Sequence, residues 1–152
     1  MSLITMFTIY SKTVKYAIAT MVYLYNNNNN NYIKVKYIAN ECNIPIQYLA
    51  KIVQKLRHNE MISSIRGPSG GIKLSKHAAS ITIEDIISSL DENLMSDNIC
   101  IMGYGTCHAH PDCALHFIWK DIREKITNGI ELSTIQELEN YHPENNKMKG
   151  ER

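Results

Sequence analysis

Three cysteines and a histidine are spaced closely enough in this sequence to hold one metal centre. They follow the pattern Cys100-x6-Cys107-x5-Cys113-x2-His116 and fall within seventeen residues. Thiolates and an imidazole suit a tetrahedral iron or zinc ion, or one face of an iron-sulfur cluster. The tight Cys-x2-Cys pair of zinc sites and the close spacings of ferredoxins are both missing. The pattern therefore predicts a metal site and leaves the metal open.

The other candidate ligands fit this site less well. His108 and His110 are alternatives, but their position beside Cys107 would strain a shared site. Cys42 falls in a helical pattern and is expected to be a small buried hydrophobic residue. No nucleophile and base, paired carboxylates or nucleotide-binding loop stands out, so the sequence does not indicate an enzyme.

Charge divides the chain into two unlike halves. The 152 residues carry a net charge of +1, yet residues 1–77 sum to +8 and residues 78–152 to −7. This asymmetry predicts that the N-terminal half faces a polyanion. The longest apolar run, 17–25, is too short for a membrane span, and four cysteines without an export signal indicate a reducing compartment. We therefore expect a soluble, cytoplasmic chain with one domain and an extension.

The first half of the chain has the pattern of a helix-turn-helix. A helical stripe in 13–25 is followed by six asparagines, 26–31, which are expected to form a surface loop without a function. A short helix is expected over 35–41, and Asn43 suits a left-handed turn. A second helix opens at Pro45. The first stripe consists of Val14, Ala17, Ile18, Met21, Val22 and Tyr25.

A β-hairpin is expected directly after the helix-turn-helix. Strand-like runs at 61–66 and 72–74 flank the glycine-rich connection 67–71. This order predicts a mainly α fold with a small β-hairpin, that is, a winged helix-turn-helix, and a double-stranded DNA partner.

The second helix and the wing contain the side chains suited to DNA. Gln47 can pair with adenine, Lys51 can donate to guanine, and Arg66 can enter a minor groove. Tyr48 falls on the apolar stripe, so packing is favoured over phosphate contact. The predicted DNA-contacting residues are Lys12, Gln47, Tyr48, Lys51, Lys55, Arg57, Arg66, Gly67, Pro68, Ser69 and Gly70.

The C-terminal half is expected to provide a dimer interface. A capped helix over 82–90 and a polar loop lead to a long amphipathic helix that ends near Asn128-Gly129. We assign its stripe to homodimerisation, with folding back on its own domain as the alternative. The stripe is Leu115, Ile118, Trp119, Ile122 and Ile126. The expected organisation is a DNA-binding domain in 1–90, a cluster-binding loop in 91–111, the dimerisation helix and a short helix in 112–140, and a flexible tail in 141–152.

Several of these motifs together resemble one protein family. They are Tyr16-Ala17, Ile38-Ala39, Arg66-Gly67-Pro68-x-Gly70-Gly71 and Cys113-x2-His116-x2-Trp119. With them the sequence is similar to the Rrf2 family of bacterial transcriptional regulators, over nearly the whole chain. The resemblance implies a homodimeric winged-helix DNA-binding protein whose loop holds an iron-sulfur cluster that senses iron, cluster supply, oxygen or nitric oxide.

Within this family the segment 113–119 is most similar to the regulators of iron-sulfur cluster biogenesis. Those regulators bind a [2Fe-2S] cluster, and the resemblance implies the ligands Cys100, Cys107, Cys113 and His116. The first cysteine spacing is longer by one residue than in those regulators. Lys15 stands where relatives that sense nitric oxide have a carboxylate, which counts against a [4Fe-4S] cluster. Ala50 replaces a glutamate of the recognition helix, so the DNA sequence that is read stays open.

The sequence thus predicts a transcriptional regulator whose DNA binding is controlled by an iron-sulfur cluster, expected to be [2Fe-2S]. Cluster binding would change the placement of the two recognition helices. The alternatives are a cluster-free thiol regulator that uses Cys107 or Cys113, and a winged-helix regulator stabilised by zinc.

Overall fold

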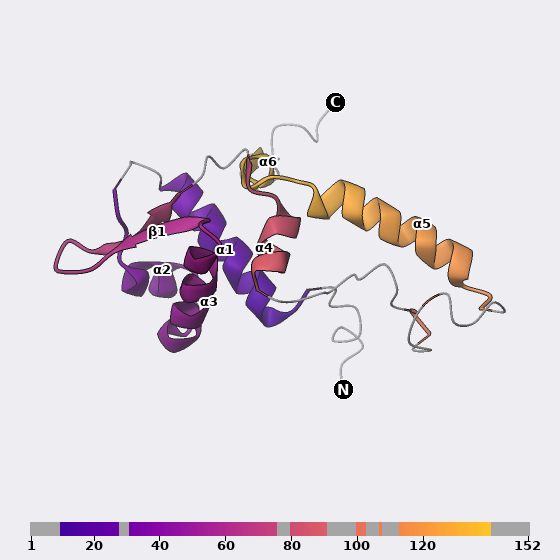
Figure 1. Cartoon of the computed structure of the whole chain (residues 1–152), viewed down its shortest axis with the longest axis horizontal. Coiled ribbons are helices and arrows are strands. Elements are labelled where there is room, and N and C mark those ends of the chain that lie inside the picture. The colour runs from indigo at the N-terminus through magenta and orange to yellow at the C-terminus, as the bar shows by residue number, and fades with distance from the viewer. Residues whose placement is uncertain are drawn as a thin grey trace, which may run out of the picture.

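The computed structural model describes residues 10–27, 31–75, 80–90, 100–102, 107 and 113–140 (Figure 1). The elements in chain order are α1 (Lys12–Asn26), α2 (Val35–Glu41), α3 (Ile46–His58), β1 (Ile62–Ile65), β2 (Gly71–Leu74), α4 (Ile83–Ser89), α5 (His116–Ile126), the π-helical turn η3 (Thr127–Glu131) and α6 (Ile135–Asn140). This order confirms the expected mainly α fold with a small β-hairpin.

Helix α1 provides the centre of the hydrophobic core. Val14, Ala17 and Met21 are fully buried, as the predicted stripe requires. The C-terminal part of the buried stripe differs from the prediction: Leu24 is buried, whereas the predicted member Val22 is only half-buried. A polar residue, Thr20, is also buried, since its hydroxyl donates a 2.7 Å hydrogen bond to the carbonyl of Tyr16.

Helices α2 and α3 form the expected helix-turn-helix. Helix α2 has the predicted bounds, and Asn43 takes a left-handed backbone conformation with φ of 53°. The Ile44 amide donates to the Ala39 carbonyl over 2.8 Å, which closes the turn. Leu49, Ile52 and Leu56 then anchor α3 in the core and leave its other face exposed.

The hairpin β1–β2 is the wing, and a single residue before α2 extends its sheet. The two strands pair antiparallel from Ile62↔Leu74 to Ile65↔Gly71. Ile33 forms a bridge to Ile72, with backbone hydrogen bonds of 2.9 and 2.8 Å. This arrangement confirms the predicted winged helix-turn-helix.

Replacing Gly71 with alanine is expected to lower the free energy of unfolding by about 2–4 kcal/mol. A Cβ at this position would collide with the backbone of Ile33 and separate the two hydrogen bonds of the bridge. Denaturant unfolding at a fixed protein concentration measures the effect. Gly129→Ala is the control, because nothing lies within 4 Å of its added Cβ. Equal unfolding midpoints for the two variants would contradict the close approach of Ile33 to Gly71.

Helix α6 packs against the winged-helix domain, beside the start of α4. The Ile135 side chain is fully buried in the main core, and its amide donates to the Ile81 carbonyl over 3.0 Å. The Ile83 amide donates to the Ser133 carbonyl over the same distance, beside a bridge between Thr82 and Thr134. Helix α6 therefore packs with the winged-helix domain, whereas the sequence grouped it with the long helix in 112–140.

The start of α4 confirms the capping box expected from the sequence. The Thr82 hydroxyl accepts from the Asp85 amide over 3.1 Å, and the Asp85 carboxylate accepts from the Thr82 amide over 3.0 Å. Two amides at the helix start are thereby satisfied by side chains.

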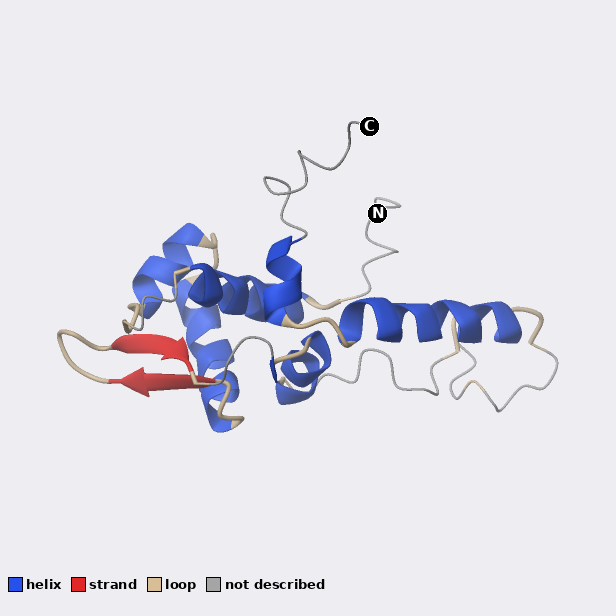
Figure 2. Cartoon of the chain, turned by 90° about the horizontal axis from the view of Figure 1, so that it is seen from above, coloured by secondary structure: helices blue, strands red, loops and turns tan. Residues whose placement is uncertain are grey.

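Helix α5 projects away from the domain as a separate arm. In Figures 1 and 2 the wing and the start of α5 lie at opposite ends of the molecule. The expected end of this helix at Asn128-Gly129 is wrong, because the helical backbone continues as η3 to Glu131. The Leu132 amide donates to the Thr127 carbonyl over 3.1 Å, which closes the wide π turn.

The inner end of the arm lies near Tyr10, two residues before the start of α1. Glu131 in η3 is buried, and its carboxylate is close enough to influence Tyr10 electrostatically. Burial, and to a smaller extent the Glu131 charge, raise the pKa of Tyr10 to about 12. The π turn is therefore part of the domain surface, and the arm extends from it.

Candidate nucleic-acid interface and cysteine site

The face of α3 opposite the core carries polar and basic side chains. Gln47 and Lys51 are exposed and stand four residues apart, so they are neighbours in the first two turns. These turns are the part of a recognition helix that reaches base edges. Arg57 is exposed at the other end of α3, in its last turn.

Tyr48 connects the start of α3 to the start of α1. Its hydroxyl lies 2.8 Å from Thr13 Oγ1, and its ring packs edge-on against Tyr16 with centroids 5.5 Å apart. The Lys12 ammonium lies over the Tyr16 ring, 5.5 Å from its centroid. These contacts account for the position of the Tyr48 side chain as packing. The contact with Tyr16 places Lys12 beside the recognition helix.

Lys55 is exposed, but its ammonium is hydrogen-bonded within the domain. Its ammonium donates a 2.7 Å hydrogen bond to the carbonyl of Leu90, the residue that caps the C-terminus of α4. Asn59 donates to the neighbouring Ser89 carbonyl over 3.3 Å. The last turn of α3 therefore satisfies carbonyls at the end of α4, where a cation is favourable.

The tip of the wing is a tight turn with an exposed arginine at its base. The Gly70 amide donates to the Gly67 carbonyl over 2.9 Å, and Gly67 has φ of 107°, which favours glycine. Arg66, Pro68 and Ser69 are exposed. The turn therefore leaves the basic side chain and the narrow tip accessible to a DNA groove.

The structure brings together two of the four predicted metal ligands. Cys107 Sγ lies 3.3 Å from His116 Nδ1, at the first residue of α5. Cys100 and Cys107 are both buried, and Cys113 is half-buried three residues before His116. His108 and His110 lie outside the described residues. Within the described ranges no group of three or more His, Cys, Asp or Glu side chains is arranged to hold a metal ion.

The Cys107–His116 pair fits adjacent ligands of one metal. A tetrahedral ion with metal–sulfur and metal–nitrogen bonds of about 2.3 and 2.0 Å holds the two donor atoms about 3.5 Å apart. The observed separation of 3.3 Å is close to this value. A thiolate and an imidazole at this spacing suit iron in a cluster as well as zinc.

Cys42 is separate from this pair. It is half-buried, and its thiol donates to the Ala19 carbonyl over 3.8 Å, between α1 and the end of α2. Burial, and secondarily the Glu41 carboxylate, raise the pKa of the Cys42 thiol. The sequence predicts a buried Cys42; it is only half-buried, but it packs against the hydrophobic core. A thiol that ionises less readily is a weaker ligand.

The predicted apolar stripe of α5 is largely uncovered. Leu115, Ile118 and Ile122 are 40%, 59% and 41% exposed. Trp119 and Ile126 are half-buried. The arm does not fold this stripe into the core of its own domain, which leaves an apolar face open for another surface.

A helix-turn-helix followed by a wing, with an exposed basic face on both, defines a winged-helix DNA-binding protein. Residues 10–141 match the model of the Rrf2 family, described as an iron-dependent transcriptional regulator. The chain belongs to this family and is a DNA-binding transcriptional regulator. No helix in the part of the chain that the structure describes is long and apolar enough to cross a membrane.

Similar proteins include regulators of two kinds. The HTH-type transcriptional regulator IscR of Klebsiella pneumoniae (strain 342) is 32% identical over 126 residues, 83% of this chain and 76% of the relative. IscR of Escherichia coli O1:K1 / APEC has the same identity and coverage. These relatives are transcriptional regulators, which confirms that the chain is not an enzyme.

Among solved structures, the chain is similar to CymR, the global cysteine regulator of B. subtilis. The TM-score is 0.73 at 26% identity, with 88% of this chain and 97% of that chain covered. T. potens IscR gives a TM-score of 0.67 at 19% identity and covers 97% and 96% of the two chains, which shows the fold alone.

Proposed function

We propose that this protein is a homodimeric regulator whose binding to its operator is controlled by an iron-sulfur cluster, of the [2Fe-2S] type. Cys100, Cys107, Cys113 and His116 are the proposed ligands. The observation that carries the proposal is the contact of Cys107 with His116 at the start of α5. The 32% identity to IscR and the iron-dependent family description support it.

The chain's own residues provide both the sensing site and its connection to DNA. When bound, the cluster supplies a centre that responds to iron supply and redox conditions. Cys107 and His116, which are already in contact, would both hold the cluster, and this would tie residue 107 to the first turn of α5. The exposed stripe of α5 packs on a second copy, so the position of the arm sets the spacing of the two recognition helices.

Each copy reads one half of the operator through α3 and the wing. Gln47 and Lys51 contact base edges in the major groove, and Arg66 enters the adjacent minor groove. Lys12, beside Tyr16, neutralises a phosphate near the start of α3. Lys55 is left out of this contact set because it is hydrogen-bonded to Leu90.

A cluster-free thiol regulator is the second candidate. The likeness to CymR at 26% identity and a TM-score of 0.73 favours it. In this case Cys107 or Cys113 would respond to oxidation directly, with His116 Nδ1 3.3 Å from the Cys107 sulfur. A zinc-stabilised form would be colourless and would lose its fold with chelators.

The test is a visible absorption spectrum with iron and acid-labile sulfide counts on anaerobically purified protein. The wild type is compared with His116→Ala and with His110→Ala as the matched control. Affinity for a selected operator is then measured for the loaded and the cluster-free protein.

A red-brown protein with equal iron and sulfide, altered only by His116→Ala, would support the proposal. The two forms must also differ in operator affinity or site preference. A colourless, iron-free protein that binds DNA and loses binding on reversible oxidation would favour the thiol regulator instead.

A further inference from the structure

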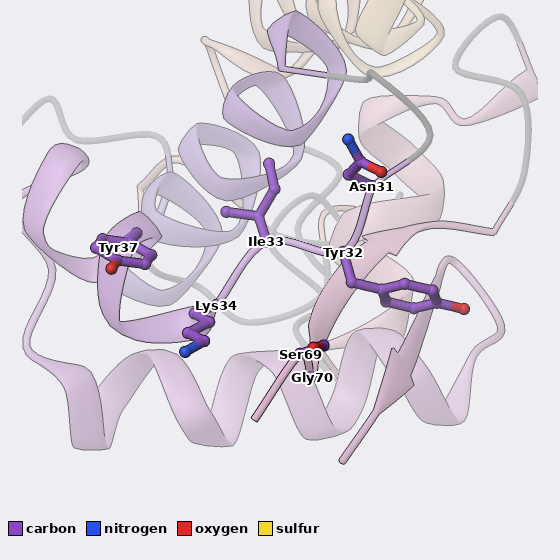
Figure 3. A pocket seen from close by; sticks show the side chains of 7 residues that line it. All are labelled: Asn31, Tyr32, Ile33, Lys34, Tyr37, Ser69 and Gly70. Atoms are coloured by element: carbon purple, nitrogen blue, oxygen red, sulfur yellow. The ribbon is translucent and has the colours of Figure 1, made fainter. Parts of the chain in front are cut away.

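A cavity of about 510 Å³ opens between the helix-turn-helix and the wing. Figure 3 shows Lys34 and Tyr37 on the α2 side of it, Ser69 at the wing turn, and Asn31 above. Tyr32 lies toward the sheet, on the other side of the opening. The cavity is therefore built by two segments that are distant in the sequence, residues 31–37 and the wing turn at 69–70.

Four exposed side chains on this cavity can donate hydrogen bonds. They are the Lys34 ammonium, the Tyr37 and Ser69 hydroxyls and the Asn31 carboxamide. Such a set, with one cation and several neutral donors, suits the oxygens of a phosphate group.

The charges around the cavity favour an anion. A second cation, Lys73, lies 4.9 Å from the centroid of the Tyr32 ring. The acidic residues between 31 and 75 are Glu41 and Glu60, and they stand at or just beyond the C-terminal ends of α2 and α3. Among the described residues that line the cavity, none carries a carboxylate.

DNA geometry places a phosphate at this position. A major groove that holds α3 and a minor groove that holds the wing are separated by one sugar-phosphate backbone. That backbone has to pass between the helix-turn-helix and the wing. We propose that the cavity is a binding site for a backbone phosphodiester, with Lys34 as its cation and Tyr37, Ser69 and Asn31 as neutral donors. This inference rests on the proposed DNA-binding mode and adds a site that reads no bases.

The site gives a role to one end of the asparagine tract. Asn31, its last residue, lies on the cavity and directly precedes the segment that bridges to the wing at Ile33. The carboxamide is neutral, so it adds a hydrogen bond without adding to the salt dependence of binding.

The experiment measures DNA affinity at several salt concentrations for Lys34→Gln, with Lys36→Gln as the matched control. Lys36 is an exposed cation in the first turn of α2, two residues after the N-cap Lys34, and it is not among the residues that line the cavity. Each protein is titrated into a duplex with the selected operator and into a random-sequence duplex.

Lys34→Gln is expected to weaken binding to both duplexes by the same factor, about fivefold. The slope of log K against log salt should fall by about 0.9, the value for one phosphate. The double variant Tyr37→Phe, Ser69→Ala should weaken binding with the slope unchanged, because no charge is lost. Lys36→Gln should have a smaller effect on both quantities.

The proposal would be overturned if Lys34→Gln and Lys36→Gln reduced the affinity and the salt-dependence slope equally, since this would indicate a diffuse basic field and not a specific site. Titration with inorganic phosphate tests whether the cavity binds a free phosphate ion and not the DNA backbone. Submillimolar binding of free phosphate that requires Lys34 would assign the cavity to a small anion and also overturn the proposal. A wild type that binds neither duplex would instead refute the proposed function itself.

Discussion

Replacing Ile118 with glutamate is expected to produce a monomer and to weaken operator binding at least about a hundredfold. Ile118 lies in the middle of the uncovered stripe of α5, between Leu115 and Ile122. A carboxylate buried in an apolar interface without a partner is strongly unfavourable. A monomer also loses the gain from two linked recognition helices on one operator. Sedimentation equilibrium and fluorescence anisotropy with labelled DNA measure the two effects.

Lys120→Glu is the control for this experiment. Lys120 is exposed on the same helix, but two residues place it about 200° around the axis from Ile118. It should leave the dimer intact. Because the Ile118 side chain is more than half exposed in the single chain, its replacement should not unfold the domain. A dimeric Ile118→Glu protein with wild-type affinity would show that α5 is not the dimer interface.

Replacing Cys107 with serine is expected to reduce bound iron and sulfide to background. Cys107 provides one of the two donor atoms that the structure brings together, and a serine hydroxyl does not supply a thiolate. Loss of a direct ligand should exceed the roughly hundredfold loss seen when a residue that only orients a ligand is removed. The visible spectrum and the iron and sulfide counts measure the result.

The winged-helix domain should survive this substitution, because Cys107 is not part of the main hydrophobic cluster. Circular dichroism and thermal unfolding check this point. Cys42→Ser is the matched control, since Cys42 lies between α1 and α2 and bonds to Ala19. It should keep its iron. Wild-type iron content in Cys107→Ser would refute the ligand assignment.

Features that depend on neighbouring residues could be predicted from the sequence. The bounds of α2, the left-handed Asn43 and the Thr82 capping box are all confirmed. Each is decided by side chains within about four positions, where propensity and local hydrogen bonding are strong. The hairpin was predictable for the same reason, from its glycine-rich turn.

Features that depend on distant contacts could not be predicted in this way. Lys55 has the sequence features of a DNA contact, yet its ammonium bonds the Leu90 carbonyl, thirty-five residues away. No local pattern tells which carbonyls at the end of α4 are left open. The return of Ile135 to the core is similar, because amphipathicity does not identify the surface that a helix joins.

The candidate metal site lies between these cases. Residue type and spacing singled out four candidate ligands, and the structure places two of them, Cys107 and His116, in contact. The participation of Cys100 and Cys113 stays a prediction. Spacings of six and five residues are compatible with many arrangements of the thiolates, so the spacing alone does not define the geometry of the site.

The described chain makes the α5 arm an insertion between α4 and α6. Helix α4 is followed by its C-cap Leu90, and the chain after η3 is bound back at Ser133, whose carbonyl accepts from the Ile83 amide near the other end of α4. Helix α6 then completes the core with Ile135, so the domain's fold closes on both sides of the inserted segment. Insertions at surface positions of this kind are readily exchanged in evolution. The arm that carries α5 can therefore be exchanged for another segment while α3 and the wing stay unchanged.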